Sequence, residues 1–104
     1  MTKATIVFCT CSTEEEALRL ARTLVERRLA ACVNVLPAMQ SVFRWEGDVQ
    51  TAAEYLLLAK TTTDRFPPLA AALTELHSYD LPEIIALPVT AGSEKFLAWI
   101  AQSV

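Results

Sequence analysis

The hydrophobic and polar positions of the chain alternate between strand-like and helix-like spacing. Residues 3–11 are rich in β-forming side chains and carry no charge after Lys3, which predicts a buried strand. The next segment, residues 12–29, begins with Ser12 or Thr13 ahead of three glutamates, a pattern typical of a capped helix N-terminus. Its apolar residues recur at helical spacing and predict one buried stripe: Ala17, Leu18, Ala21, Leu24, Val25 and Leu29.

A long β-hairpin is predicted next. Residues 30–45 have β-type periodicity broken at Pro37, which fits only an edge, a bulge or a bend. A turn over 46–48 precedes a second strand over 49–61; we reject a helix there because residues 56–58 lack a polar face. Strands of this length reach roughly 40 Å, about twice the usual strand. The hairpin must therefore project from so small a body, and we expect it to pair with neighbouring subunits.

The remaining sequence adds a helix, a strand and a final helix. Asp64 is expected to begin the second helix, with Pro67 and Pro68 tolerated in or near its first turn. Residues 83–89 predict the last strand and residues 94–102 a short terminal helix. The order β-α-β-β-α-β predicts an α+β, ferredoxin-like sandwich: a four-stranded antiparallel sheet with both main helices on one face. All 104 residues are assigned to this one domain.

Composition excludes several classes of protein. The chain is 53% hydrophobic with a net charge of −3, which is incompatible with disorder. A pI near 5.0 argues against a nucleic-acid partner, and the chain has neither an apolar run long enough for a membrane span nor a signal-peptide pattern. Three cysteines cannot all pair within one chain, and Cys9 and Cys11 share a strand face, so we expect a reduced, cytoplasmic protein.

Familiar enzyme motifs are missing from the sequence. With one histidine, a two-histidine metal motif cannot form within a chain, and no phosphate-binding glycine loop or nucleophile elbow is present. No nucleophile has an adjacent base in sequence. A non-enzymatic protein is therefore predicted.

The densest polar cluster runs from His77 to Glu83, where the second helix turns back toward the last strand. Imidazole and carboxylate suit a borderline divalent ion such as copper(II). The alternative is that the cluster binds no metal, and that the histidine simply ends the helix beside a carboxylate in the turn. Cys32 has two interpretations. It is a functional thiol, either a soft metal ligand or a reactive group, or it is an unreactive side chain that only packs in the core. Cys9 and Cys11 are interpreted mainly as strand packing.

Two further features point to contacts between subunits. Trp45 sits at the predicted hairpin tip, where a monomer would leave its large apolar surface in water, so we interpret it as an interface anchor. Glu54 and Lys60 share one face of the second hairpin strand. They are either a solvated pair of charges or, where the strand is covered, polar contacts that line a cleft between subunits.

Four segments resemble, in order, the sequence blocks of the CutA family of divalent-cation tolerance proteins: ERRLAACVNV, SVFRWEG, LLLAKTT and HSYDLPEIIALPV. The resemblance implies a ferredoxin-like subunit, similar to PII-type signalling proteins, that forms a homotrimer through its long hairpin. It also implies a role in tolerance of divalent metals, with copper(II) binding. Where the family usually has a proline, this chain has Ser78, which predicts a less constrained loop; where the family often has an aromatic residue, it has Arg44.

The family's recurrent residues match eight positions here: Cys32, Trp45, Glu54, Lys60, His77, Tyr79, Pro82 and Glu83. The leading hypothesis is a non-enzymatic trimer without an organic cofactor that binds copper(II) or another divalent cation near subunit boundaries. Its candidate metal ligands are Cys32, His77 and Glu83. The alternative is a PII-like signalling trimer that binds a small molecule or anion in inter-subunit clefts. Those clefts would be lined by Trp45, Glu54, Lys60 and Tyr79.

Overall fold

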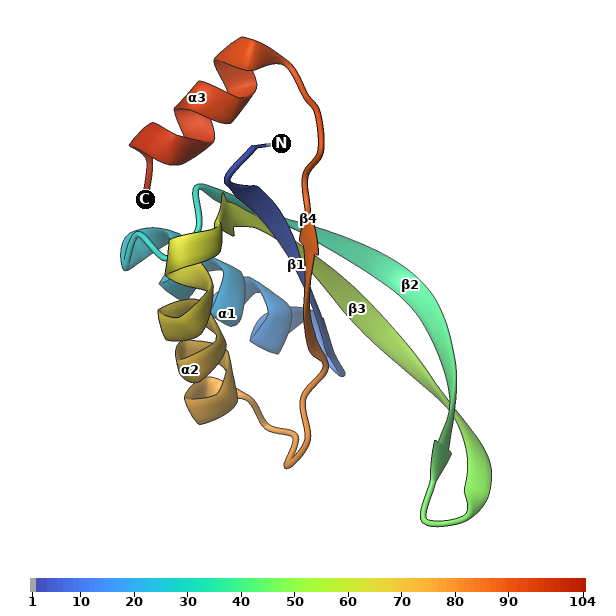
Figure 1. Ribbon diagram of the computed structural model, residues 1–104. Helices are drawn as coiled ribbons and strands as arrows, with labels where there is room; N and C mark the ends of the chain where they lie inside the picture. Colours follow the sequence, from blue (N-terminus) through green and yellow to red (C-terminus); the bar gives the residue numbers. More distant parts are fainter. Residues whose placement is uncertain (1) are drawn as a thin grey trace.

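The computed structural model describes residues 2–104 as a four-stranded antiparallel sheet with two helices on one face and a third helix beyond one end (Figure 1). In chain order the elements are β1 (Ala4–Cys11), α1 (Glu14–Glu26), β2 (Cys32–Trp45), β3 (Asp48–Thr62), the 3-10 turn η1 (Thr63–Arg65), α2 (Phe66–Leu76), β4 (Ile84–Pro88) and α3 (Glu94–Gln102). The strand order is β2-β3-β1-β4. The ferredoxin-like α+β prediction is therefore confirmed. Within this part of the chain, no helix has the length and apolar character needed to cross a membrane.

The hydrophobic core lies between the sheet and helices α1 and α2. Its members come from both layers: Val7, Cys9 and Cys11 of β1, Leu57 and Ala59 of β3, Leu20 and Leu24 of α1, and Leu69 and Leu73 of α2. The predicted stripe of α1 is right at Ala17 and Leu24 but wrong at Leu18 and Val25, which are 53% and 41% exposed. Leu20 is buried instead, because α1 presents a slightly rotated face to the sheet.

The two main helices begin in different ways. At α1, the side chain of Thr13 accepts a hydrogen bond of 3.1 Å from the backbone N–H of Glu16, as the capping pattern predicted. The prediction that Asp64 begins α2 is wrong: Asp64 lies in η1, and α2 starts at Phe66. The Asp64 carboxylate accepts a bond of 2.7 Å from the Thr62 hydroxyl, which lowers the pKa of Asp64.

The β2–β3 hairpin projects well beyond the helical layer (Figure 1). Its strands contain 14 and 15 residues, and the molecule is 44 Å long but only 25 and 23 Å across. Glu46 and Gly47 form the turn with φ of 51° and 87°, the left-handed conformation that a two-residue hairpin turn requires. Pro37 lies in a bulge of the edge strand, next to Ala38 with φ of 60°, so the predicted irregularity at Pro37 is confirmed.

No element formed by residues 2–104 covers the face of the sheet opposite α1 and α2. The strand register places a continuous set of apolar side chains there, which we call the open face: Ile6, Phe8, Leu36, Leu56, Leu58, Ile85 and Leu87. Leu36, Ile85 and Leu87 are 41%, 51% and 45% exposed. Helix α3 does not cover this face but packs at the end of the sheet, where Ile100 contacts Ala4 and Ala31.

Candidate functional site

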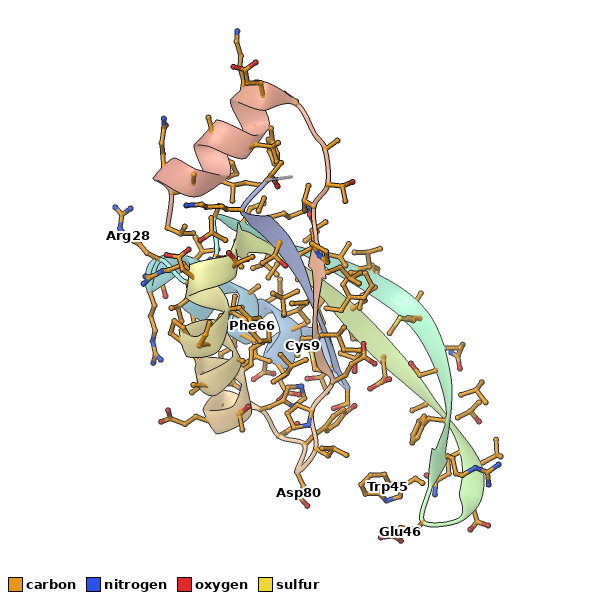
Figure 2. The ribbon with its side chains drawn as sticks, viewed as in Figure 1. Cys9, Arg28, Trp45, Glu46, Phe66 and Asp80 are labelled. Carbon is orange, nitrogen blue, oxygen red and sulfur yellow. The ribbon has the colours of Figure 1, made fainter. Side chains whose placement is uncertain are left out.

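A cleft of about 680 Å³ lies between the outer half of the hairpin and the turn that follows α2. Three aromatic and three acidic residues contribute to its walls: Phe43, Trp45, Tyr79, Glu54, Asp80 and Glu83. Figure 2 shows Trp45 on the side of the hairpin that faces the turn carrying Asp80. The structure thus brings together four residues that the sequence singled out from distant segments: Trp45, Glu54, Tyr79 and Glu83.

Tyr79 and Glu54 join the turn to the hairpin. The Tyr79 hydroxyl donates a hydrogen bond of 2.7 Å to Oε2 of Glu54, whose residue surface is only 8% exposed. Burial and the adjacent Glu54 carboxylate raise the pKa of Tyr79 well above its usual range. Tyr79 therefore remains a hydrogen-bond donor at every pH at which the protein is expected to work.

His77 is buried beneath the same turn. Its Nε2 lies 2.7 Å from the carbonyl oxygen of Thr10, so Nε2 carries the hydrogen and donates it. Its Nδ1 accepts a bond of 3.0 Å from the backbone N–H of Tyr79. Both ring nitrogens are therefore used within the chain, and coordination of a metal by His77 would require one of these bonds to break. The ligand role of His77 stays a prediction.

Glu16 belongs to the site although its place in the sequence gives no sign of this role. Its buried carboxylate accepts bonds from the Ser78 backbone N–H at 2.8 Å and the Ser78 hydroxyl at 2.9 Å. Arg19 and His77 each approach the carboxylate to 3.8 Å. The expectation of a less constrained loop at Ser78 is therefore wrong, because a proline could donate neither of these two bonds. In the sequence Glu16 looked like the last of three glutamates that favour a helix N-terminus.

Lys60 and Cys32 lie far from this cleft. Cys32 on β2 is paired directly with Lys60 on β3. Glu54 is six residues from Lys60 along β3, toward the hairpin turn, which at about 3.3 Å per residue places it about 20 Å away. Glu83 immediately precedes β4 on the opposite edge of the sheet from Cys32, three strand spacings or about 14 Å across. Accordingly, residues 2–104 contain no group of three or more His, Cys, Asp or Glu side chains placed to hold one metal ion. Cys32, His77 and Glu83 are not brought together within one chain.

The three cysteines are free and differ in environment. Cys9 and Cys11 point into the core, and burial raises the pKa of the Cys9 thiol to about 12 and that of Cys11 to about 11. Both are thus protonated and unreactive at neutral pH, consistent with their interpretation as packing residues. Cys32 is only partly buried, and its register position places it on the open-face side of the sheet.

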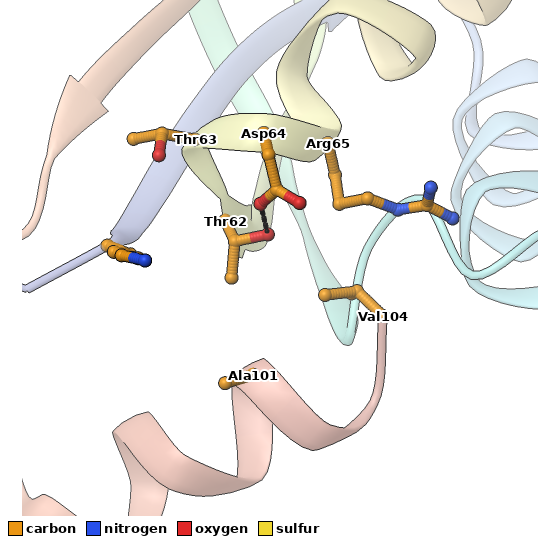
Figure 3. Close-up of a pocket in the computed structure, with 7 residues that line it drawn as sticks. Thr62, Thr63, Asp64, Arg65, Ala101 and Val104 are labelled. Atoms are coloured by element: carbon orange, nitrogen blue, oxygen red, sulfur yellow. Dashed lines mark hydrogen bonds between the residues drawn. The ribbon is translucent and has the colours of Figure 1, made fainter.

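A second pocket, of about 440 Å³, lies between η1 and α3 (Figure 3). Lys3, Asp64 and Arg65 contribute charges of both signs to its wall. The Arg65 guanidinium already donates to the carbonyl oxygen of Arg28, through Nε at 3.2 Å and a terminal nitrogen at 2.9 Å. This pocket therefore has no consistent charge preference, and none of the candidate metal-ligand or cleft residues predicted from the sequence lines it.

Comparison with known proteins gives matches over nearly the whole chain. The family model for the CutA1 divalent ion tolerance protein matches residues 5–103. The divalent-cation tolerance protein CutA of Thermus thermophilus is 46% identical over 98 residues, covering 94% of this chain and 95% of the relative. The chloroplastic protein CutA of Arabidopsis thaliana is 44% identical over 94% of this chain, which spans only 54% of that longer relative.

Solved structures agree with these sequence matches. The crystal structure of CutA from Xylella fastidiosa superposes with a TM-score of 0.95 at 38% identity and covers 98% of both chains. The divalent cation tolerance protein of Thermus thermophilus superposes with a TM-score of 0.94 at 45% identity, covering 96% of this chain and 97% of the other. The projecting hairpin and the turn after α2 are thus part of a shared fold.

Proposed function

Because this chain belongs to the CutA1 divalent ion tolerance family, we propose that it is a non-enzymatic homotrimer that acts in divalent-cation tolerance. In this proposal it binds copper(II) or a similar divalent cation at or near its subunit boundaries. The observation that carries the proposal is the open face, a continuous apolar surface beside a hairpin that projects past its own helices. Such a surface is typical of a protein–protein interface.

The positions of the candidate ligands support a site shared between copies. Cys32 and Glu83 lie on opposite edges of the sheet, at least about 14 Å apart, and cannot reach one ion from the same chain. Copies that pack through the open face would bring the edge of one sheet toward the edge of another. A thiolate or carboxylate from one copy and an imidazole or carboxylate from its neighbour would then complete a coordination sphere.

Assembly is tested by replacing Leu87, which is 45% exposed on the open face, with aspartate. A buried carboxylate without a partner is strongly unfavourable in an interface, so Leu87→Asp should shift sedimentation velocity from trimer to monomer. Leu18→Asp is the matched control, because Leu18 is 53% exposed on the opposite, helical side. A wild-type particle of 11.5 kDa would refute the trimer.

Metal binding is tested by titrating copper(II) into the assembled protein in a calorimeter. We expect Glu83→Gln, His77→Ala and Cys32→Ser each to weaken binding or reduce its stoichiometry. Glu75→Gln, an exposed position on α2, is the control for a simple change of charge. Unchanged affinity and stoichiometry in His77→Ala would remove His77 from the ligand set and leave it as the residue that positions the turn.

We also propose a cytoplasmic location. All three cysteines are free, as is usual in a reducing compartment. Relatives differ in this respect: the Arabidopsis thaliana protein is described as chloroplastic and the Archaeoglobus fulgidus protein as periplasmic. Fractionation of cells that express this protein would test the location, and recovery outside the cytoplasm would refute it.

A further inference from the structure

The bulge in β2 joins two parts of the hairpin that pair in different registers. From Leu36 to Met39, β2 advances by three residues while β3 advances by two. Tyr55, which lies opposite the bulge, pairs on its other side with Cys11, the last residue of β1. Beyond this point the two hairpin strands pair only with each other (Figure 1). The bulge therefore marks the place where the hairpin leaves the sheet.

We propose that the outer half of the hairpin, residues 39–54, has two accessible registers, and that Pro37 selects the observed one. The observed register adds Phe43 and Trp45 to the open face. The register itself is a property of a single chain and is measured without reference to assembly. Its consequence for the contact between copies rests on the proposed homotrimer.

The observed register places two residues other than glycine in the left-handed backbone conformation. Ala38 in the bulge has φ of 60°, and Glu46 in the turn has φ of 51°. A Cβ atom makes this conformation costly, which is why glycine usually occupies it. The observed register therefore needs a stabilising contribution that its backbone does not supply.

A second register would avoid both of these strained positions. If the pairing of the inner half continued without a bulge, the hairpin would close through a loop of three residues, Trp45–Gly47. The common three-residue hairpin loop ends on a residue in the left-handed conformation, and Gly47 already has φ of 87°. Only a glycine would then carry that conformation. The shifted register is thus compatible with the sequence of the turn.

Pro37 opposes the shifted register. In that register Pro37 would face Tyr55 in a regular strand pair. Proline has no N–H to contribute to a strand ladder, and it is accommodated at bulges and edges. Keeping the bulge at Pro37 therefore stabilises the observed register against the strain at Ala38.

The two registers place different side chains beside the open face. The β3 residues opposite Phe43 and Trp45 lie on the same side of β3 as Leu56, so both aromatic rings extend the open face into the outer half. A shift by one residue turns each side chain of the outer strand to the other face. Val42 and Arg44 would then take these places. A cation would enter the surface that neighbouring copies are proposed to cover, so the observed register is the one that favours assembly.

The register is tested by nuclear magnetic resonance of the full-length protein, because contacts between Cα protons identify facing residues on paired strands. A Val42–Thr51 contact marks the observed register, and a Phe43–Val49 contact marks the shifted one. The wild-type protein should show only the first contact. Pro37→Val should show the second contact, either as a separate set of resonances or in place of the first.

Ala38→Gly is the matched second substitution. It relieves the strain in the bulge, so in the Pro37→Val protein it should raise the ratio of observed to shifted register about tenfold. An unchanged ratio in this double variant would overturn the proposal. The proposal also fails if Pro37→Val keeps only the Val42–Thr51 contact, or if it loses both contacts because the hairpin no longer pairs.

The consequence for assembly is tested with aspartate at two neighbouring positions of β2. Phe43→Asp should sediment mainly as a monomer at a concentration at which Val42→Asp remains assembled, because only Phe43 shares the face of Leu56. Equal sedimentation of the two variants would overturn the assignment of this face. A wild-type monomer would instead refute the proposed homotrimer, and the Pro37→Val spectrum would still decide between one register and two.

Discussion

Replacing Glu16 with glutamine should destabilise the protein by removing the anchor of the turn after α2. The Glu16 carboxylate accepts two hydrogen bonds from Ser78, at 2.8 and 2.9 Å, from a position that is 7% exposed. Hydrogen bonds to a charged group contribute about 1.5–3 kcal/mol, and glutamine keeps one acceptor oxygen but turns an NH₂ group toward the second donor. We expect Glu16→Gln to lower the free energy of unfolding by about 2 kcal/mol.

Glu15→Gln is the control for this variant. Glu15 occupies the same first turn of α1 but is exposed, so its substitution removes the same charge from the helix N-terminus without removing contacts. That charge contributes only about 0.3–1 kcal/mol. Urea unfolding of both variants should be followed at one protein concentration, because assembly adds to apparent stability. Hydrogen exchange at the Ser78 amide should accelerate only in Glu16→Gln. Equal stability losses with unchanged Ser78 exchange would refute the anchoring role.

Two further predictions concern the core. Leu57 is 1% exposed and lies between the sheet and the helices. Leu57→Ala should therefore lower the free energy of unfolding by about 2–5 kcal/mol in the same urea assay. A loss of less than about 1 kcal/mol would contradict this packing. Burial raises the pKa of Cys9 to about 12 and of Cys11 to about 11, from 9.0, so the native state holds both thiol protons more tightly than the unfolded chain. Their contribution to stability is therefore complete below about pH 9 and is lost as pH rises toward 12. Unfolding between pH 8 and 11 should show a shallower decline in the Cys9→Ala, Cys11→Ala double variant, and an equally steep decline would refute the assignment.

The order of elements could be predicted because each one carries a local signal. Helix α3 begins after a serine whose side chain accepts from the Phe96 N–H, and its predicted bounds match the structure. Gly47 marks the hairpin turn, and Pro37 marks the bulge in an edge strand. These signals lie within a few residues of the structure that they determine. Where the signal was ambiguous, as at Asp64, the predicted helix start was wrong, because the Asp64 side chain bonds the nearby Thr62 hydroxyl instead of capping α2.

The candidate site could be predicted only in part, because its contacts join distant segments. Glu16 and Ser78 are 62 positions apart, and Thr10 and His77 are 67 apart. Sequence spacing carries no information about such pairs, so a buried acceptor was interpreted as one of several helix-capping charges. The same limit applies to Glu54 and Lys60. They share a strand face as predicted, but six residues of strand keep them about 20 Å apart, and only Glu54 reaches the cleft.

The two walls of the cleft are held in different ways, and this difference links assembly to binding. One wall is the turn after α2, which is bonded to three other elements through Thr10, Glu16 and Glu54. The other wall is the outer half of the hairpin, where Val42 and Val49 are 68% and 66% exposed and the strands bond only to each other. In the proposed trimer, neighbouring copies would cover this half and fix its distance from the turn. A ligand that bridges the two walls would then favour the assembled state, and by reciprocity the assembled state would bind that ligand more tightly.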